Sequence, residues 1–298
     1  MSLNLVITGA SGFVGRSLLA NPPLGFNLKL VAANDHQIIT QGQVIKAYQI
    51  PTETWGPDTS ILHLASARRG ASAAKREKVD FQFTLRIAQK AAKEGARDFV
   101  FLSCLQGEAA PYKQRAEAAL APLFQNSSTR LIMLVLPNVY GPLGQSLENR
   151  LVRLAKAGVK LPLAHLGDPQ PRLYVGNLTH ALRLLFTQSI PSGVYWISDG
   201  DELAWGEFYD VVYQRLQGVQ GCFRFAPVEW LLRLGEWLQT KEAEPPWLHY
   251  WRRLFAAKDV RGNDFAQAVG WQPPLTPLAA LDEWLSWEAG LEEAASPD

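Results

Sequence analysis

Short apolar runs alternate with amphipathic stretches through the first half of the 298-residue chain. The runs are rich in β-branched residues and are bounded by glycine, proline or polar residues, which is typical of parallel strands buried on both faces. They are LNLVITG, NLKLVAA, SILHLAS, RDFVFLSC and RLIMLVLPNVYG. Between them, ASGFVGRSLLA and KVDFQFTLRIAQKAAKEGA have helical spacing. Strands alternating with helices predict the α/β class, as a doubly wound parallel sheet of the Rossmann type with right-handed crossovers.

The pattern changes from about residue 142, where prolines and tryptophans become more frequent and the elements shorter. Apolar residues recur at helical spacing in SLENRLVRLAKAG, DELAWGEFYDVVYQRLQG and PVEWLLRLGEWLQTK. Aromatic-rich helices of this kind are typical of the core of a cap; a ligand lid, a homodimer face and a membrane-surface helix are the alternatives. We therefore expect a Rossmann domain over residues 1–141, to which residues of about 170–200 return, and a smaller α/β lobe over 142–298 that mainly forms a substrate-binding cap.

The overall composition excludes several classes of protein. Hydrophobic residues at 47% and charged residues at 19% are typical of a soluble globular chain, and a net charge of +1 gives no electrostatic reason to expect nucleic acid as a partner. The two cysteines are too few for a disulfide framework and favour a reducing compartment. No run approaches the roughly 20 apolar residues that span a bilayer. We expect a cytoplasmic protein with no integral membrane segment.

Three glycines stand between the first predicted strand and the first predicted helix. Gly9, Gly12 and Gly15 form the pattern T-G-x-x-G-x-x-G. Glycines in this context allow a tight turn and let the backbone approach a pyrophosphate, to which the helix N-terminus offers free N–H groups and a positive dipole. The alternative is a turn that needs glycine only for packing the strand against the helix. The strand–turn–helix context favours a dinucleotide site.

The end of the second predicted strand bears on the choice of dinucleotide. An acidic side chain there binds the ribose hydroxyls of NAD, whereas an arginine accepts the 2′-phosphate of NADP. Here the position falls on Asn34 and Asp35, and no arginine follows the strand. The sequence favours NAD and leaves NADP open. The alternative is that both residues only form the turn.

Several separated motifs occur together in one order: TGASGFVG, ILHLAS, VDFQFTL, FVFLS, PNVYGP, RLYVGNL and VGWQPPLTPLAALDEWLSW. In this the chain resembles the extended short-chain dehydrogenases, namely the NAD-dependent epimerase/dehydratase family and within it the bacterial nucleotide-sugar 4-epimerases. The resemblance runs over almost the whole length. It implies an NAD-dependent epimerase or reductase that transfers hydride to and from a UDP-sugar-like substrate.

The resemblance also assigns binding residues. It puts a first group at the pyrophosphate and along the nicotinamide-side strand: Gly9, Ser11, Gly12, Phe13, Val14, Gly15, Leu64, Ala65 and Ser66. It puts a second group at the nucleotide-sugar diphosphate: Asn138, Asn149, Arg172 and Arg253. Two arginines from separate segments suit this role, because a planar guanidinium grips a diphosphate through two hydrogen bonds.

The chain departs from the family at the catalytic positions. The family uses a tyrosine with a lysine four residues later on the same helix face. Tyr112 is present, but Ala116 follows at the lysine position. Arg115, three residues after the tyrosine, is expected to reach the same face and act as its electrostatic partner, whereas Lys113 is expected to point elsewhere.

The hydroxyl that the family places at the end of the preceding strand is displaced as well. Cys104 occupies that position, with Ser103 one residue earlier, and only seven residues separate Cys104 from Tyr112. A thiol is a weak hydrogen-bond donor, and no acid follows the strand, which argues against dehydratase chemistry. Two hypotheses follow: an epimerase or reductase with an atypical catalytic motif, and a non-catalytic dinucleotide-binding sensor or assembly protein. The sequence does not choose between them.

Overall fold

The computed structural model describes most of the chain and divides it into two compact units. The first comprises Met1–Val139, Leu173–Ser198 and Arg261–Pro274, and the second comprises Tyr140–Arg172, Asp199–Val260 and Leu275–Asp298. The described residues are 3–32, 43–46, 50, 52–105, 107–162, 169–188, 190–200, 203–223 and 263–295. Residues 261–274 thus belong to the first unit, although the sequence placed them with the cap.

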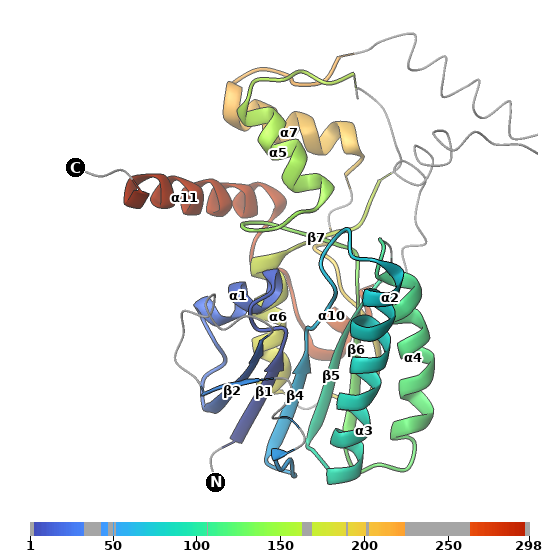
Figure 1. The fold of residues 1–298 in the computed structure, drawn as a ribbon. Helices are drawn as coiled ribbons and strands as arrows, with labels where there is room; N and C mark the ends of the chain where they lie inside the picture. The colour runs from blue at the N-terminus through green and yellow to red at the C-terminus, as the bar shows by residue number, and fades with distance from the viewer. Residues whose placement is uncertain are drawn as a thin grey trace, which may run out of the picture. The chain divides into compact units, whose positions relative to one another are not determined.

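The first unit is built on a seven-stranded sheet in the order β3-β2-β1-β4-β5-β6-β9, with every neighbouring pair parallel (Figure 1). The strands are β1 (Leu3–Thr8), β2 (Phe26–Ala32), β3 (Gln43–Lys46), β4 (Thr59–His63), β5 (Asp98–Cys104), β6 (Arg130–Leu136) and β9 (Gly193–Trp196). This confirms the predicted doubly wound α/β fold. The strand order reverses between β1 and β4, and in such sheets ligands bind at the carboxyl ends of the strands beside the reversal.

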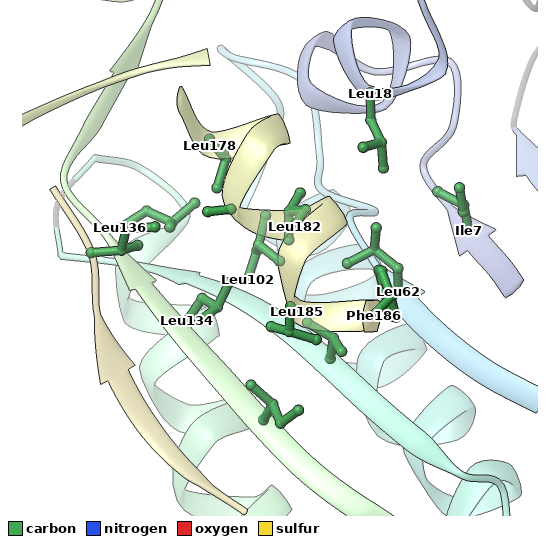
Figure 2. Packing of buried hydrophobic residues seen from close by; sticks show 14 of the residues in the cluster. Ile7, Leu18, Leu62, Leu102, Leu134, Leu136, Leu178, Leu182, Leu185 and Phe186 are labelled. Carbon is green, nitrogen blue, oxygen red and sulfur yellow. The ribbon is translucent and has the colours of Figure 1, made fainter. Parts of the chain in front are cut away.

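Helices cover both faces of this sheet because neighbouring residues of each strand point to opposite sides. One core joins side chains such as Leu62 and Leu102 to helices α1, α6 and α10. Figure 2 shows the part of it around α6, with Leu18 of α1 beside it. The other joins Ile61 and Phe101 to α3 and α4. The helices are α1 (Phe13–Ala20), α2 (Ala73–Arg76), α3 (Thr84–Glu94), α4 (Ala110–Phe124), α6 (Val175–Thr187) and α10 (Asp264–Val269).

One segment departs from regular α-helix. The stretch predicted as a single helix over 78–96 begins as the π-helix η3 (Glu77–Phe83), which joins α2 to α3. Asp80 lies in this wider turn, and its buried carboxylate is directed back to the end of β4, where it accepts a hydrogen bond from the Ser66 hydroxyl at 2.6 Å. Single π-turns of this kind are frequent at functional sites.

The second unit is mainly helical. It contains α5 (Leu147–Lys156), α7 (Trp205–Gln217) and α11 (Pro277–Ala295), and the short pair β7 (Asn138–Tyr140) and β8 (Arg172–Tyr174) lies where the chain passes between the units. Helix α7 packs on α5, and the Tyr213 hydroxyl donates to the Gly158 carbonyl at 2.9 Å. The helix expected in PVEWLLRLGEWLQTK lies outside the described residues. Within the described part, no helix is both long and apolar enough to cross a membrane.

Candidate functional site

The glycine loop between β1 and α1 leaves no room for side chains at two of its three glycines. Gly9 has a φ of +71°, and a Cβ there would lie 2.6 Å from the backbone nitrogen of Ala65. A Cβ on Gly15 would lie 2.5 Å from the Ala10 carbonyl oxygen. Both glycines are therefore required by the fold itself, because the loop is packed directly on the end of β4 and on the first turn of α1.

Gly12 differs from the other two. It is the N-cap of α1, its φ of −77° is one that any residue adopts, and a Cβ there would meet only the Gly9 carbonyl oxygen, at 3.1 Å. No side chain caps the helix and its first turn holds no acid, so the N–H groups there can meet an anion. Gly12 is solvent-exposed, and Ser11, Phe13 and Val14 around it are half-buried. The missing side chain at Gly12 fits a bound pyrophosphate better than it fits packing.

The segment after β4, where the resemblance puts Leu64, Ala65 and Ser66 beside the nicotinamide, lies against this loop, and its contact with a cofactor stays a prediction. The Leu64 amide donates to the Thr8 carbonyl at 3.1 Å, and Ala65 backs onto Gly9. Ser66 is tied to Asp80. Three of the predicted groups (the glycine loop, the end of β4 and the end of β5) thus lie at one edge of the sheet.

The orientation of α4 corrects the predicted catalytic pair. Lys113 is buried, and its Nζ donates to the Leu102 carbonyl at 2.7 Å and lies 5.7 Å from the centre of the Phe101 ring. Arg115 is exposed, forms an ion pair with Glu77 and lies over the Phe81 ring. The expectation that Arg115 serves the site while Lys113 points elsewhere is therefore wrong.

Helix geometry explains the correction. Lys113 falls on the same stripe as Ala116 and Leu120, which α4 buries against the sheet, whereas Arg115 falls on the outer face. The residue four positions before Lys113 is Ala109, which caps the helix. A tyrosine and a lysine separated by one helical turn therefore do not occur here. Tyr112 is half-buried in the first turn of α4, and its part in proton transfer stays a prediction.

The two residues at the end of β5 have different surroundings. Ser103 is fully buried, and its hydroxyl donates to the Glu117 carboxylate on α4. Cys104 is half-buried, and burial raises the pKa of its thiol; the charge of Lys113 partly opposes this, while those of Asp80 and Glu117 add to it. The thiol is therefore protonated at neutral pH and is a poor nucleophile.

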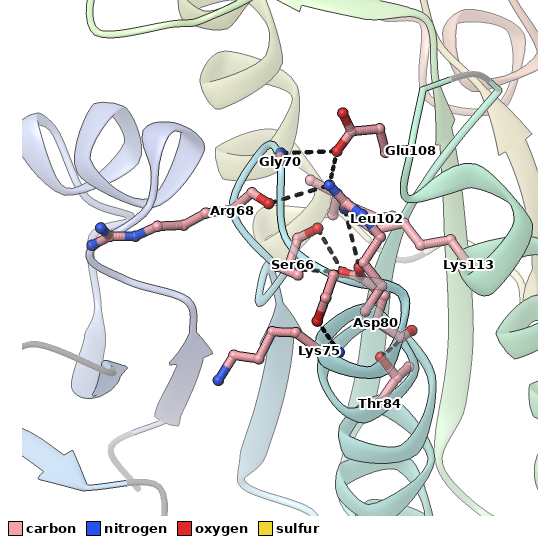
Figure 3. A network of polar contacts seen from close by, with 12 residues as sticks. Ser66, Arg68, Gly70, Lys75, Asp80, Thr84, Leu102, Glu108 and Lys113 are labelled. Carbon is pink, nitrogen blue, oxygen red and sulfur yellow. Dashed lines mark hydrogen bonds and ion pairs between the residues drawn. The ribbon is translucent and has the colours of Figure 1, made fainter.

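Sequence reasoning missed a buried polar network at the same edge of the sheet, shown in Figure 3. The Asp80 carboxylate accepts from the Ser66 hydroxyl and from the Ala67 amide, and lies 3.6 Å from the Arg76 guanidinium. Arg76 also binds Glu108, which lies 32 residues further along the chain. A Ser and a Glu in two loops, with an Arg in α2 and an Asp in η3, carry no recognisable spacing, so only the fold brings them together.

His63 is a second buried group that the sequence did not single out. Its Nδ1 lies 2.8 Å from the Thr8 hydroxyl and its Nε2 lies 2.9 Å from the Thr84 hydroxyl. The Thr84 hydroxyl donates to the Asp80 carbonyl, so Nε2 carries the proton of a neutral ring and Nδ1 accepts. Burial, with a smaller effect from Lys113, lowers the pKa of His63 to about 3. The imidazole is thus a neutral bridge between β1 and α3.

The predicted substrate residues in the second unit make internal contacts. Arg172 is buried between the rings of Trp205 and Phe208 and pairs with Glu148 at 3.5 Å. Burial lowers the pKa of Arg172, and Glu148 opposes that effect. The Asn149 amide donates to the Gly141 carbonyl at 2.6 Å. These contacts hold the loop before α5 and the start of β8.

The remaining predicted residues are placed less fully. Asn138 is half-buried at the start of β7. Asn34, Asp35 and Arg253 lie outside the described residues, so their predicted roles, and with them the choice between NAD and NADP, stay predictions.

The sequence matches no protein-family model and no curated protein. Solved structures match it over nearly its full length. The Bordetella bronchiseptica enzyme WbmF in complex with NAD+ and UDP has a TM-score of 0.71 at 16% identity, covering 98% of this chain and 94% of that one. UDP-N-acetylglucosamine 4-epimerase from Bacillus cereus has 0.70 at 15%, covering 100% and 98%. dTDP-glucose 4,6-dehydratase from Bacillus anthracis in complex with NAD has 0.68 at 16%, covering 98% of each chain. The chain has the fold of these enzymes.

Proposed function

We propose that this chain binds NAD at the glycine loop and a nucleoside diphosphate sugar beside it, and acts as an epimerase or reductase by hydride transfer. The observation that carries the proposal is the uncapped first turn of α1 behind the exposed Gly12, in a loop packed on the segment after β4. Support comes from solved structures of the same fold, which hold NAD and, in WbmF, UDP as well. The substrate would be of the UDP-sugar type.

Different residues of the chain would bind the cofactor, supply a charge and transfer the proton. Bound NAD would supply the hydride acceptor, and its pyrophosphate would accept hydrogen bonds from the N–H groups of Phe13 and Val14 at the start of α1, since the Gly12 N–H already donates to the Gly9 carbonyl. Lys113 sets a fixed positive charge at the end of β5, held there by the Leu102 carbonyl. Tyr112, in the turn of α4 next to it, is the group that would exchange a proton with the sugar hydroxyl. The Ser103 hydroxyl already donates to the Glu117 carboxylate, so it would not take part in the proton transfer.

A second candidate is a non-catalytic protein that binds the same dinucleotide and responds by a change in stability or association. It is favoured by one observation, the alanine at position 109 on the face of α4 that Lys113 occupies, because a tyrosine there is what the family's chemistry requires. This candidate predicts that NAD raises the melting temperature without turnover of any nucleotide sugar. Turnover that Tyr112→Phe abolishes would rule it out.

Replacing each of the two cationic residues of α4 in turn tests the proposed reaction. Lys113→Met should lower turnover of a UDP-sugar by roughly 100-fold, since it removes the only one of these cations that faces the end of β5. Arg115→Ala should change turnover less than twofold, because Arg115 is exposed and pairs with Glu77 on the surface. The measurement is NADH absorbance or sugar-nucleotide conversion with each variant. Greater sensitivity at Arg115 would contradict the assignment.

A further inference from the structure

We propose that Arg76 and the backbone amide of Gly70 form a binding site for a carboxylate, which Glu108 occupies in the free protein and which the carboxylate of an acidic sugar takes over. The ligand would be a nucleotide sugar of the uronic acid class. In naming that substrate class, the proposal rests on the function proposed above. The site itself rests on a different set of contacts.

Arg76 is a charged group that the fold buries and fixes. Its side chain is 6% exposed, and its Nη1 lies 3.6 Å from the Asp80 carboxylate. Asp80 is fully buried and is held in turn by the Ser66 hydroxyl and the Ala67 amide. The Nη2 of Arg76 donates to the Arg68 carbonyl at 3.2 Å, and its remaining bond goes to Glu108. Asp80 and the Arg68 carbonyl thus fix the guanidinium, and its Nη2 is left to bind the carboxylate of Glu108.

Glu108 is the removable member of this arrangement. One oxygen of its carboxylate accepts from both Arg76 and the Gly70 amide, the latter at 2.9 Å, and dashed lines join these groups in Figure 3. The side chain is 53% exposed and follows Gly107, around which there is open space. The hydrogen bond from the Gly70 amide is the main cause that lowers the pKa of Glu108. Glu108 therefore occupies the site as a carboxylate. Released from the site, this carboxylate returns to water at small cost.

Arg76 cannot follow Glu108 into solvent. A buried guanidinium that loses an acceptor keeps an unsatisfied donor, and replacing that acceptor is strongly favoured. Asp80 already places one negative charge beside Arg76. The site therefore suits a singly charged carboxylate better than a phosphate with two negative charges. A carboxylate also matches the contact that Glu108 makes, one oxygen shared by a guanidinium and an amide.

The site lies where a substrate of this fold would be bound. It joins the loop after β4 to the loop between β5 and α4, at the carboxyl ends of both strands. Cys104 at the end of β5 is close enough for four charges to act on its thiol, namely Lys113, Asp80, Glu117 and Arg76. Glu108 is not one of these charges but Arg76 is, so a carboxylate that pairs with Arg76 in a Glu108→Gln variant is expected to change the reactivity of Cys104, which gives a chemical reporter.

A matched pair of ligands tests the proposal. UDP-glucuronate and UDP-glucose differ only in a carboxylate against a hydroxymethyl group, and each is titrated by calorimetry in the presence of NAD. Glu108→Gln removes the internal competitor, so it should tighten UDP-glucuronate about tenfold and UDP-glucose less than twofold. Glu77→Gln is the control. It removes the same negative charge from the neighbour of Arg76 in sequence, but Glu77 pairs with Arg115 and not with Arg76. Equal shifts for both sugars, or none, would overturn the carboxylate site and leave the proposed function standing.

A second measurement decides the case in which neither nucleotide sugar binds and the proposed function fails. Iodoacetamide labelling is followed by mass spectrometry at Cys104, with Cys222 of the second unit as internal reference. Free glucuronate should slow labelling of Cys104 at least threefold in Glu108→Gln, and should not do so when Arg76→Lys is added, because lysine keeps the charge beside Asp80 but loses the fork. Labelling of Cys104 that glucuronate leaves unchanged in Glu108→Gln refutes the site by itself.

Discussion

Gly12→Val is expected to weaken NAD binding at least 100-fold while the protein stays folded. The backbone at Gly12 is in a conformation that valine adopts without strain, and the nearest atom to a new Cβ is the Gly9 carbonyl oxygen at 3.1 Å. The cost to stability should be about 1 kcal/mol, that of a poor N-cap. The branched side chain would, however, stand in front of the N–H groups of α1, where a pyrophosphate must approach the backbone.

Gly15→Val is the matched control for this experiment. Its Cβ would lie 2.5 Å from the Ala10 carbonyl oxygen and 2.6 Å from that of Gly9, so the variant should lose several kcal/mol of stability by overpacking. Calorimetric titration with NAD and a thermal melt of both variants separate the two effects. A Gly12→Val protein that is folded and binds NAD with unchanged affinity would show that this loop is not the dinucleotide site.

Acid is expected to destabilise the protein well before its carboxylates titrate, because His63 is buried as a neutral ring. Its pKa is about 3 in the folded state against an ordinary value of 6.5, so between these values the unfolded chain binds the extra proton. The stability that this histidine contributes is complete above pH 6.5 and is lost as the pH falls towards 3. From pH 6.5 to pH 5 the free energy of unfolding should fall by about 2 kcal/mol.

Urea unfolding at the two pH values checks this expectation. His63→Gln keeps hydrogen-bonding groups between Thr8 and Thr84 but does not titrate, so the variant should be less stable at pH 6.5 and lose little more at pH 5. His180→Gln is the control: burial lowers the pKa of His180 as well, but this residue is only half-buried, so it should contribute less than the fully buried His63. A wild type and a His63→Gln variant with the same pH slope would show that His63 is not neutral in the folded protein.

The fold and the glycine loop could be predicted because both are written in local patterns. Apolar runs such as those of β1 and β5 and the spacing of Gly9, Gly12 and Gly15 depend on residues close in sequence. The face of α4 that is buried against the sheet could not be predicted in the same way. It depends on the burial of a single stripe of the helix, and the sequence Tyr112-Lys113-Gln114-Arg115 offers two cations on different faces.

The network of Arg76, Asp80 and Glu108 could not be predicted from the sequence for a related reason. Arg76 and Asp80 lie in the crossover from β4 to β5 and Glu108 in the loop after β5, and each alone is an ordinary helix or loop residue. The π-helix that aims Asp80 at β4 has no propensity signal of its own. His63 in turn belongs to an apolar run; burial, with a smaller effect from Lys113, keeps it neutral, and its partners Thr8 and Thr84 are distant in sequence.

A crystal structure of the chain with NAD and a UDP-sugar tests the central claim most directly. We predict that the pyrophosphate accepts hydrogen bonds from the N–H groups of Phe13 and Val14, in front of Gly12, and that the nicotinamide ribose lies within hydrogen-bonding distance of Lys113 Nζ at the end of β5. A dinucleotide bound away from the first turn of α1, or a nicotinamide that does not reach Lys113, would contradict the proposed function.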